Sequence, residues 1–200
     1  MHVRRASRGS ARPLNCGVRR HANRHMNLHL VDTNPKVVDA WKAAFAEFSE
    51  IEVEHSDLLA RAQGCVVSPA NSYGFMDGGI DAAYRAFFGA SIESAVREAV
   101  DRRPEGHLPV GAAILVPTRH PRVPYMIVAP TMMTPEAVES RNVYRAMRAI
   151  LRLALREKSV VVDVYCPGLG SGVGQVSPGE SAEMMASAYG DWKKSTAGVA

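Results

Sequence analysis

The chain has 200 residues and a mass of 21.7 kDa, which corresponds to one domain, or to one domain with a tail. It is 46% hydrophobic and 22% charged, an ordinary balance for a globular protein with a buried core. No stretch approaches the roughly 18 consecutive apolar residues of a membrane span, so we expect no membrane partner. Cys16, Cys65 and Cys166 are too few and too scattered for a disulfide framework or a zinc site. We therefore expect a reducing, cytoplasmic setting.

The net charge of +4 is concentrated at the N-terminus, because residues 1–25 hold seven arginines and no acidic side chain. The remaining residues carry 17 basic and 20 acidic side chains, a net charge of −3. The high pI of about 9.1 therefore does not indicate a nucleic-acid-binding domain, and nucleic acid is expected only through the basic tail. Residues 1–25 lack apolar side chains and are predicted to be a disordered tail; alternatively, synthesis begins at Met26. Residues 26–200 are predicted to form the domain.

From residue 26 onward, strand and helix patterns alternate. Apolar and β-branched runs predict strands at residues 28–31, 51–54, 64–68, 112–116, 125–129 and 159–165. Helical spacing of apolar side chains predicts helices at residues 36–48, 80–100 (with a break near Gly89), 142–157 and 178–194. This alternation predicts an α/β domain with helices on both faces of the sheet.

A loop rich in glycine, residues 167–174, follows the last strand and precedes the last helix. Its glycines, at every second position from Gly168 to Gly174, allow successive backbone N–H groups to converge on an anion. Phosphates bind at such positions in α/β folds. The loop lacks the Lys-Ser/Thr of a Walker A motif and lies too late in the chain for a dinucleotide fingerprint. A tight structural turn is the alternative interpretation.

A second segment, residues 68–81, follows another apolar strand. Asn71 leaves this strand at the edge of the sheet where ligands bind, and Gly78 and Gly79 permit close approach of a ligand to a helix N-terminus. Asp81 falls in the first turn of that helix. A carboxylate at this position also has a purely structural use, as a partner of the helix dipole.

Taken together, four segments resemble the macro domain family, whose members bind ADP-ribose. In chain order they are Asp57, Ser68-Pro69-Ala70-Asn71-Ser72, Met76-Asp77-Gly78-Gly79-Ile80-Asp81 and Gly170-Ser171-Gly172-Val173-Gly174. The resemblance covers roughly residues 51–192. It implies a three-layer α/β/α sandwich with a central mixed, mostly parallel sheet.

The resemblance also implies roles for individual residues. Asp57 would accept a hydrogen bond from the adenine amino group, and the Leu58 N–H would reach a ring nitrogen. Asn71 would hold the distal ribose, and Asp81 would hold or activate a water beside it; these two are the candidate catalytic residues. The remaining candidate ligand-binding residues are Ser68 and, as a clamp on the diphosphate, Gly78, Gly79, Ile80, Gly170, Ser171, Gly172, Val173 and Gly174. No metal and no cofactor are expected.

The sequence departs from the family pattern in three places, one of which is Gln175, where relatives often have glycine. Met76 and Asp77 stand where relatives often have glycine, which would bring a bulky thioether and a negative charge near the diphosphate. The chain also ends after the helix at residues 178–194, where a usual macro domain continues into one more strand and helix. We infer a circular permutation, in which the N-terminal unit fills the missing slot and Asp32, Thr33 and Asn34 line the adenine end. The alternative is an extra edge strand.

The leading functional hypothesis is hydrolysis of an ADP-ribosyl linkage in an ADP-ribosylated protein, O-acetyl-ADP-ribose or ADP-ribose phosphate, by a monomer. A reader module that binds ADP-ribose without cleaving it is the alternative. The pair Asn71 and Asp81 favours the enzyme, whereas Met76 and Asp77 favour the reader. A Rossmann-type nucleotide enzyme is disfavoured, since no Gly-x-Gly-x-x-Gly follows the first strand.

Overall fold

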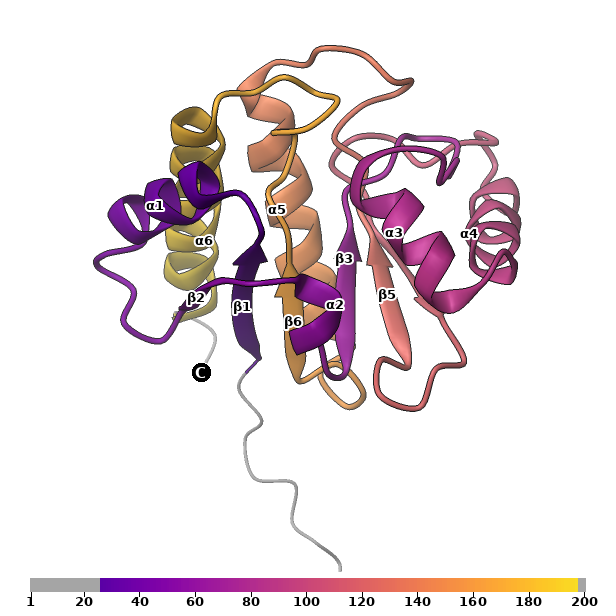
Figure 1. Cartoon of the computed structure of the whole chain (residues 1–200), viewed down its shortest axis with the longest axis horizontal. Helices are drawn as coiled ribbons and strands as arrows, with labels where there is room; N and C mark the ends of the chain where they lie inside the picture. The colour runs from indigo at the N-terminus through magenta and orange to yellow at the C-terminus, as the bar shows by residue number, and fades with distance from the viewer. Residues whose placement is uncertain (1–25, 198–200) are drawn as a thin grey trace, which may run out of the picture.

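The computed structural model describes residues 26–197, which form a central sheet between two layers of helices (Figure 1). The predicted tail, residues 1–25, lies outside the described residues. The strands are β1 (Asn27–Asp32), β2 (Glu52–His55), β3 (Cys65–Ser68), β4 (Ile114–Pro117), β5 (Tyr125–Val128) and β6 (Asp163–Cys166). The helices are α1 (Pro35–Ala44), α2 (Leu58–Arg61), α3 (Gly79–Phe88), α4 (Ser91–Asp101), α5 (Ser140–Arg156) and α6 (Pro178–Ala197).

The sheet has the strand order β2-β1-β6-β3-β5-β4. Its pairs are parallel except for β4, which runs antiparallel to β5 at one edge. Side chains of α1, α5 and α6 bury one face of the sheet, and side chains of α2, α3 and α4 bury the other. Figure 1 accordingly shows α5 behind the sheet and α2 and α3 in front of it. The prediction of a three-layer α/β/α sandwich around a mixed, mostly parallel sheet is confirmed.

Strand β1 lies inside the sheet, where Leu30 pairs with Val53 of β2 on one side and with Cys166 of β6 on the other. The alternative of an extra edge strand is therefore wrong. Leu28 and Leu30 are buried in one layer of the core and Val31 in the other, as expected for a strand covered on both faces. On its other side, β1 lies next to β6, the strand that leads into the glycine-rich loop.

Three predicted boundaries need correction, and the first is the helix predicted at residues 36–48, which ends at Ala44. The helical stretch 80–100 is divided at Gly89, as expected, because this residue has a φ of +87°. The strand predicted at residues 159–165 begins only at Asp163, since the N–H groups of Val160 and Val161 close a turn on the carbonyl of Glu157. The strand predicted at residues 112–116 begins at Ile114. The four-residue helix α2 was not predicted.

The parallel strands end at a common edge of the sheet, at the top of Figure 1, and the loops that follow them meet there. These loops come after β1, β3, β5 and β6, and the first turns of α2 and α3 begin at the same edge. Chain segments far apart in the sequence are thus brought together at the place where α/β folds bind ligands. Within residues 26–197, no helix has the length and apolar character needed to cross a membrane.

Candidate functional site

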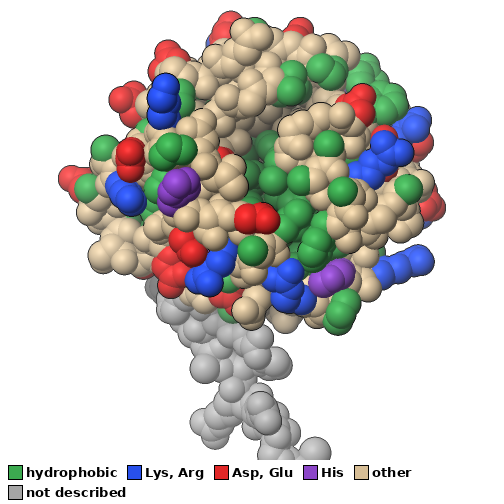
Figure 2. Space-filling view, viewed as in Figure 1, with side chains coloured by type: hydrophobic (Ala, Val, Ile, Leu, Met, Phe, Trp, Pro, Cys, Tyr) green, Lys and Arg blue, Asp and Glu red, His purple; other side chains and the backbone are tan. Residues whose placement is uncertain are grey.

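A cavity of about 480 Å³ opens at this edge of the sheet, within the size range of small-molecule sites. Figure 2 shows this face of the molecule hollowed near its middle, with hydrophobic side chains gathered around the hollow. All but one of the predicted site residues line the cavity: Asp57, Leu58, Asn71, Gly78, Gly79, Ile80, Asp81, Gly170, Ser171, Gly172, Val173 and Gly174. The exception is Ser68, which is fully buried beneath the cavity.

The glycine-rich loop forms one wall of the cavity, and two of its glycines are required by packing. A Cβ atom on Gly170, whose φ is +68°, would lie 2.9 Å from a methyl of Val143, and one on Gly174 would lie 2.7 Å from the Gly170 carbonyl oxygen. Gly172 differs, because a Cβ there would meet no protein atom within 4 Å. Within the described residues, no backbone or side-chain acceptor engages the N–H groups of residues 171–174. These N–H groups are available to a bound anion.

Two side chains hold this loop in place. Asp32, at the end of β1, accepts hydrogen bonds from Gly168 N at 3.0 Å and from Asn34 N at 2.8 Å. The Ser181 hydroxyl of α6 donates to the Leu169 carbonyl at 2.7 Å. The loop is therefore anchored to β1 on one side and to α6 on the other.

The opposite wall is the N-terminus of α3, where Gly78 is the N-cap and no side chain caps the helix. The first-turn N–H groups have no partner within the helix, and the helix dipole favours an anion near them. A Cβ on Gly78 or Gly79 would meet nothing within 4 Å, so both glycines leave this wall open to a ligand. Met76 is fully buried in the core, so the expectation that its thioether stands near the diphosphate is wrong; Asp77 does line the cavity.

Asn71 shapes the loop between β3 and α3 from within. Its side-chain oxygen accepts hydrogen bonds from Tyr73 N at 3.1 Å and Phe75 N at 3.3 Å, and its Nδ2 donates to the Phe75 carbonyl at 3.0 Å. The side chain is almost fully buried. One N–H of its amide group remains for a ligand, since NH₂ carries two donors. Asn71 thus supports the loop and faces the cavity at the same time.

Asp81 is a buried carboxyl in the wall of the cavity, with 8% of its surface exposed. The Ser68 hydroxyl donates to its Oδ1 at 2.6 Å. Burial raises the pKa of Asp81 from 3.8 to about 7, the Ser68 hydrogen bond opposes this shift, and the charge of Asp77 adds to it. The carboxyl can therefore accept or release a proton near neutral pH, which is the property of an acid–base group.

The other end of the cavity is built around α2. Asp57 caps this helix by accepting a hydrogen bond from Leu59 N at 2.9 Å, and Leu58 follows it in the cavity wall. Arg122 fixes the far end of α2, since its guanidinium donates to the carbonyls of Leu59, Ala60 and Ala62. Asp32, Thr33 and Asn34 line this part of the cavity, as the permutation hypothesis predicts. The contact of Arg122 with α2 was not predicted from the sequence, because Arg122 does not lie in a recognisable motif.

The cavity contains four aspartates and, among the described residues that line it, no Lys, Arg or His. An anionic ligand would therefore be held by backbone N–H groups rather than by basic side chains. No group of three His, Cys, Asp or Glu suited to a metal ion occurs within residues 26–197. Cys166 is buried below the glycine-rich loop, and burial raises the pKa of its thiol, which fits a packing role.

Comparison with known proteins identifies the family of the chain. The model of the macro domain family matches residues 67–185, and the chain belongs to that family. An uncharacterized protein of Aquifex aeolicus is 39% identical over 137 residues, which cover 68% of this chain and 78% of the relative. The family match begins within β3, so β1, α1 and β2 lie outside it.

Two solved structures show the same fold. The macrodomain of Mycobacterium tuberculosis DarG has a TM-score of 0.59 and 22% identity, over 68% of this chain and 88% of that one. Thermosipho africanus DarTG in complex with ADP-ribose has a TM-score of 0.57 and 13% identity, over 78% of this chain and 48% of that one.

Proposed function

We propose that the protein binds ADP-ribose in this cavity and hydrolyses an ADP-ribosyl linkage. One observation carries the proposal: two segments with unengaged backbone N–H groups, residues 78–81 and 171–174, line the same cavity of a macro domain. Two such segments suit a diphosphate, because the backbone N–H groups of each segment can bind one phosphate without the help of a basic side chain.

The two ends of the cavity suit the two ends of this ligand. At one end, the free carboxylate oxygen of Asp57 and the N–H of Leu58 offer an acceptor and a donor side by side, which match the amino group and a ring nitrogen of adenine. At the other end, Asn71 and Asp81 offer an amide and a carboxyl to the hydroxyls of the distal ribose. The aliphatic side chains of Val31 and Val37 line the cavity beside Asp32–Asn34 and would contact the base.

Asp81 is the group that we assign to the chemistry. A water held by its carboxylate would attack the ribose carbon that bears the substituent, or the acetyl carbonyl carbon of an ester, and Asp81 would take the proton of that water. The bond from that carbon to the leaving group then breaks, Asp81 gives the proton to the leaving group, and ADP-ribose and the unmodified acceptor, or acetate, are the products. A carboxyl with a pKa of about 7 is half ionised at neutral pH and can serve both proton transfers.

The reader module is supported by one specific observation. The exposed carboxylate of Asp77 also lines the cavity, and its negative charge disfavours the ionised form of Asp81. The ionised form is the one that would act as a base, so this charge favours binding without cleavage. Turnover distinguishes the two functions. The purified chain is incubated with one protein-linked and one acetyl-linked ADP-ribose substrate, and release of ADP-ribose is measured beside Asp81→Asn.

We expect turnover by the wild type and a loss of about two to four orders of magnitude in Asp81→Asn, with ADP-ribose affinity changed by less than about 1 kcal/mol. Binding of ADP-ribose without cleavage of either substrate would replace the enzyme with the reader. Full activity of Asp81→Asn would remove Asp81 from the chemistry.

A further inference from the structure

Helix α5 carries a row of arginines on its outer face. We call this row the arginine stripe; its members are Arg141, Arg145, Arg148, Arg152 and Arg156. At 3.6 residues per turn they fall within an arc of about 80°, on the side opposite the buried residues Ala146 and Ile150. The stripe is about 22 Å long at 1.5 Å per residue. Four of its side chains are exposed and Arg148 is half-buried.

The stripe is a strong local positive charge on a domain, residues 26–200, whose net charge is negative. Helix α5 contains five arginines and no Asp or Glu. The rest of residues 26–200 holds 12 basic and 20 acidic side chains, a net charge of −8. The average of −3 over the whole domain conceals this polarisation, and the expectation that nucleic acid binds only through the tail was based on that average.

The middle of the stripe is left without charge partners. Arg141 pairs with Glu139 at 2.6 Å, and Arg156 pairs with its neighbour Glu157 at 3.0 Å. Within residues 26–197, no carboxylate lies within 4.0 Å of Arg145, Arg148 or Arg152; a guanidinium N–H of Arg152 donates to the Gly111 carbonyl. None of these three guanidinium groups has a carboxylate at ion-pair distance within the described residues, so an anion bound across them would offset their mutual repulsion.

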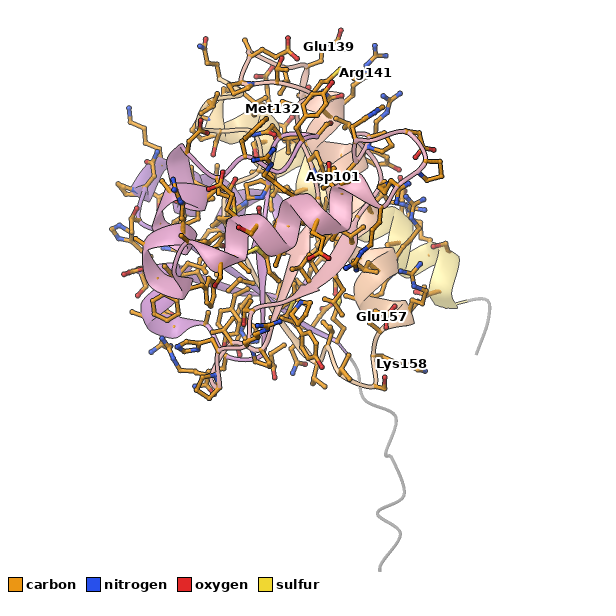
Figure 3. All side chains as sticks on the ribbon, turned by 90° about the vertical axis from the view of Figure 1, so that its right-hand side faces the viewer. Asp101, Met132, Glu139, Arg141, Glu157 and Lys158 are labelled. Atoms are coloured by element: carbon orange, nitrogen blue, oxygen red, sulfur yellow. The ribbon has the colours of Figure 1, made fainter. Side chains whose placement is uncertain are left out.

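The stripe leads away from the cavity. In Figure 3, Glu139 and Arg141 lie at the same end of the molecule as Met132, which lines the cavity, whereas Glu157 and Lys158 lie at the opposite end. The start of α5 is tied to the cavity wall, because Asn142 Nδ2 donates to the Thr131 carbonyl at 3.0 Å. A linear anion on the stripe would therefore run along the back of the domain, from the cavity end to the other end.

We propose that the arginine stripe binds the sugar-phosphate backbone of a nucleic acid. The planar fork of arginine matches phosphate oxygens, and the helix offers arginine at all five positions and lysine at none. One strand of a duplex carries a phosphate about every 3.4 Å along the axis, so the stripe spans about six phosphates. Tyr144, the one aromatic side chain of α5, is half-buried and donates its hydroxyl to Asp191, so the stripe offers no free aromatic ring for a base to stack on, and we expect binding without sequence preference.

An anionic membrane is a weaker fit to the same face. Interfacial helices insert a row of apolar side chains beside their basic residues. The apolar side chains of α5 instead pack into the core, and Leu155, 39% exposed, is the one large apolar side chain of this helix among the exposed hydrophobic residues of the described chain.

The test measures binding of the full chain to fluorescein-labelled oligonucleotides of about 20 nucleotides or base pairs, longer than the stripe, over a range of salt concentrations. Single-stranded DNA, duplex DNA and duplex RNA are compared, and vesicles with phosphatidylserine form a separate arm. The variant is the triple substitution Arg145→Gln, Arg148→Gln and Arg152→Gln. The control removes the same charge from exposed positions elsewhere: Lys42→Gln on α1, Arg61→Gln on α2 and Arg102→Gln at the C-cap of α4. Both variants keep residues 1–25, so the tail contributes equally.

We expect the stripe variant to bind oligonucleotides at least about tenfold more weakly than the control at low salt, and to lower the slope of log affinity against log salt by about two to three. Equal affinity of the stripe variant and the control would overturn the proposal, as would binding to vesicles but not to oligonucleotides. The readout does not involve ADP-ribose, so neither result bears on the proposed function. Titration of both variants with ADP-ribose, expected to be unchanged, checks that both are folded.

Discussion

Ser68, at the end of β3, donates a hydrogen bond of 2.6 Å from its hydroxyl to the carboxyl of Asp81, in the first turn of α3. Both side chains are buried, and only Asp81 lines the cavity. Any effect of Ser68 on a ligand in the cavity would therefore pass through Asp81 rather than through direct contact. Hydrogen bonding to the ionised carboxyl favours that form, whereas burial and the charge of Asp77 favour the neutral form.

Replacing Ser68 by Ala should raise the pKa of Asp81 further, because the hydrogen bond that lowers this pKa is removed. A hydrogen bond to a charged group contributes about 1.5–3 kcal/mol, so its loss should raise the pKa of Asp81 by about one to two. The change can be followed directly by NMR titration of the Asp81 carboxyl carbon. The acidic limb of kcat/KM, where Asp81 loses its role as a base, should move to higher pH by the same amount.

Ser72→Ala is the matched control for this substitution. Ser72 is also fully buried in the same segment, but its hydroxyl donates to the Met132 carbonyl. Removal of the Ser72 hydroxyl should leave the pKa of Asp81 unchanged. Titration of Asp81 at the same pH in wild type and Ser68→Ala would show that the hydroxyl does not control this carboxyl.

Asp81 should also make the stability of the fold depend on pH. Its pKa is raised in the folded state, so between about pH 4 and pH 7 the folded chain keeps a proton that the unfolded chain releases. Stability is therefore lost as pH rises through this window, on the order of 4 kcal/mol for this residue. Urea unfolding at pH 5 and pH 8 should show Asp81→Asn to be more stable than wild type at pH 8. If the free energy of unfolding fell equally between pH 5 and pH 8 in wild type and in Asp81→Asn, the burial of an ionisable Asp81 would be contradicted.

Gly172→Glu should abolish the phosphate clamp without unfolding the loop. A side chain at Gly172 meets no protein atom within 4 Å, so the substitution places a carboxylate in the cavity and not in the core. Repulsion of the diphosphate in a confined groove should weaken ADP-ribose binding by at least about 3 kcal/mol. Gly179→Glu, an equally open and exposed glycine in the first turn of α6 and outside the cavity, adds the same charge and should bind normally. Normal binding by Gly172→Glu would place the diphosphate elsewhere.

Much of the site could be predicted because the parallel strands end at one edge of the sheet. The segments around Asp57, Asn71 and Gly172 each follow a strand, so strand assignment alone brings them together. The side-chain contacts within that edge could not be predicted. That Met76 turns into the core, and that Ser68 reaches Asp81, depends on how α3 packs over β3.

Three other features of the structure could not be predicted: the pairing of β1, the short helix α2 and the local charge of α5. The place of β1 between β2 and β6 was one of two alternatives, because both an edge strand and an inner strand can carry the pattern Leu28–Val31. Helix α2 is one turn long and has no periodicity to detect. The arginine stripe is visible in the sequence of α5, but the net charge of the domain masks it.

Asp57 should control the preference for adenine. Asp57→Ala removes the acceptor for the amino group, so the affinity difference between ADP-ribose and its hypoxanthine analogue should shrink. The substitution also removes the cap of α2, at a cost of about 1 kcal/mol. Asp57→Ser retains a capping hydroxyl and should lose the base preference equally, which separates the two effects. An unchanged preference in both variants would move the adenine away from α2.

The most direct test of the central claim is calorimetric titration of the purified chain with ADP-ribose, AMP and NAD. We predict one site for each chain and tightest binding of ADP-ribose, because AMP lacks the second phosphate and the distal ribose that residues 71–81 would hold. No heat with ADP-ribose, or AMP bound as tightly as ADP-ribose, would contradict the assignment of the cavity as an ADP-ribose site.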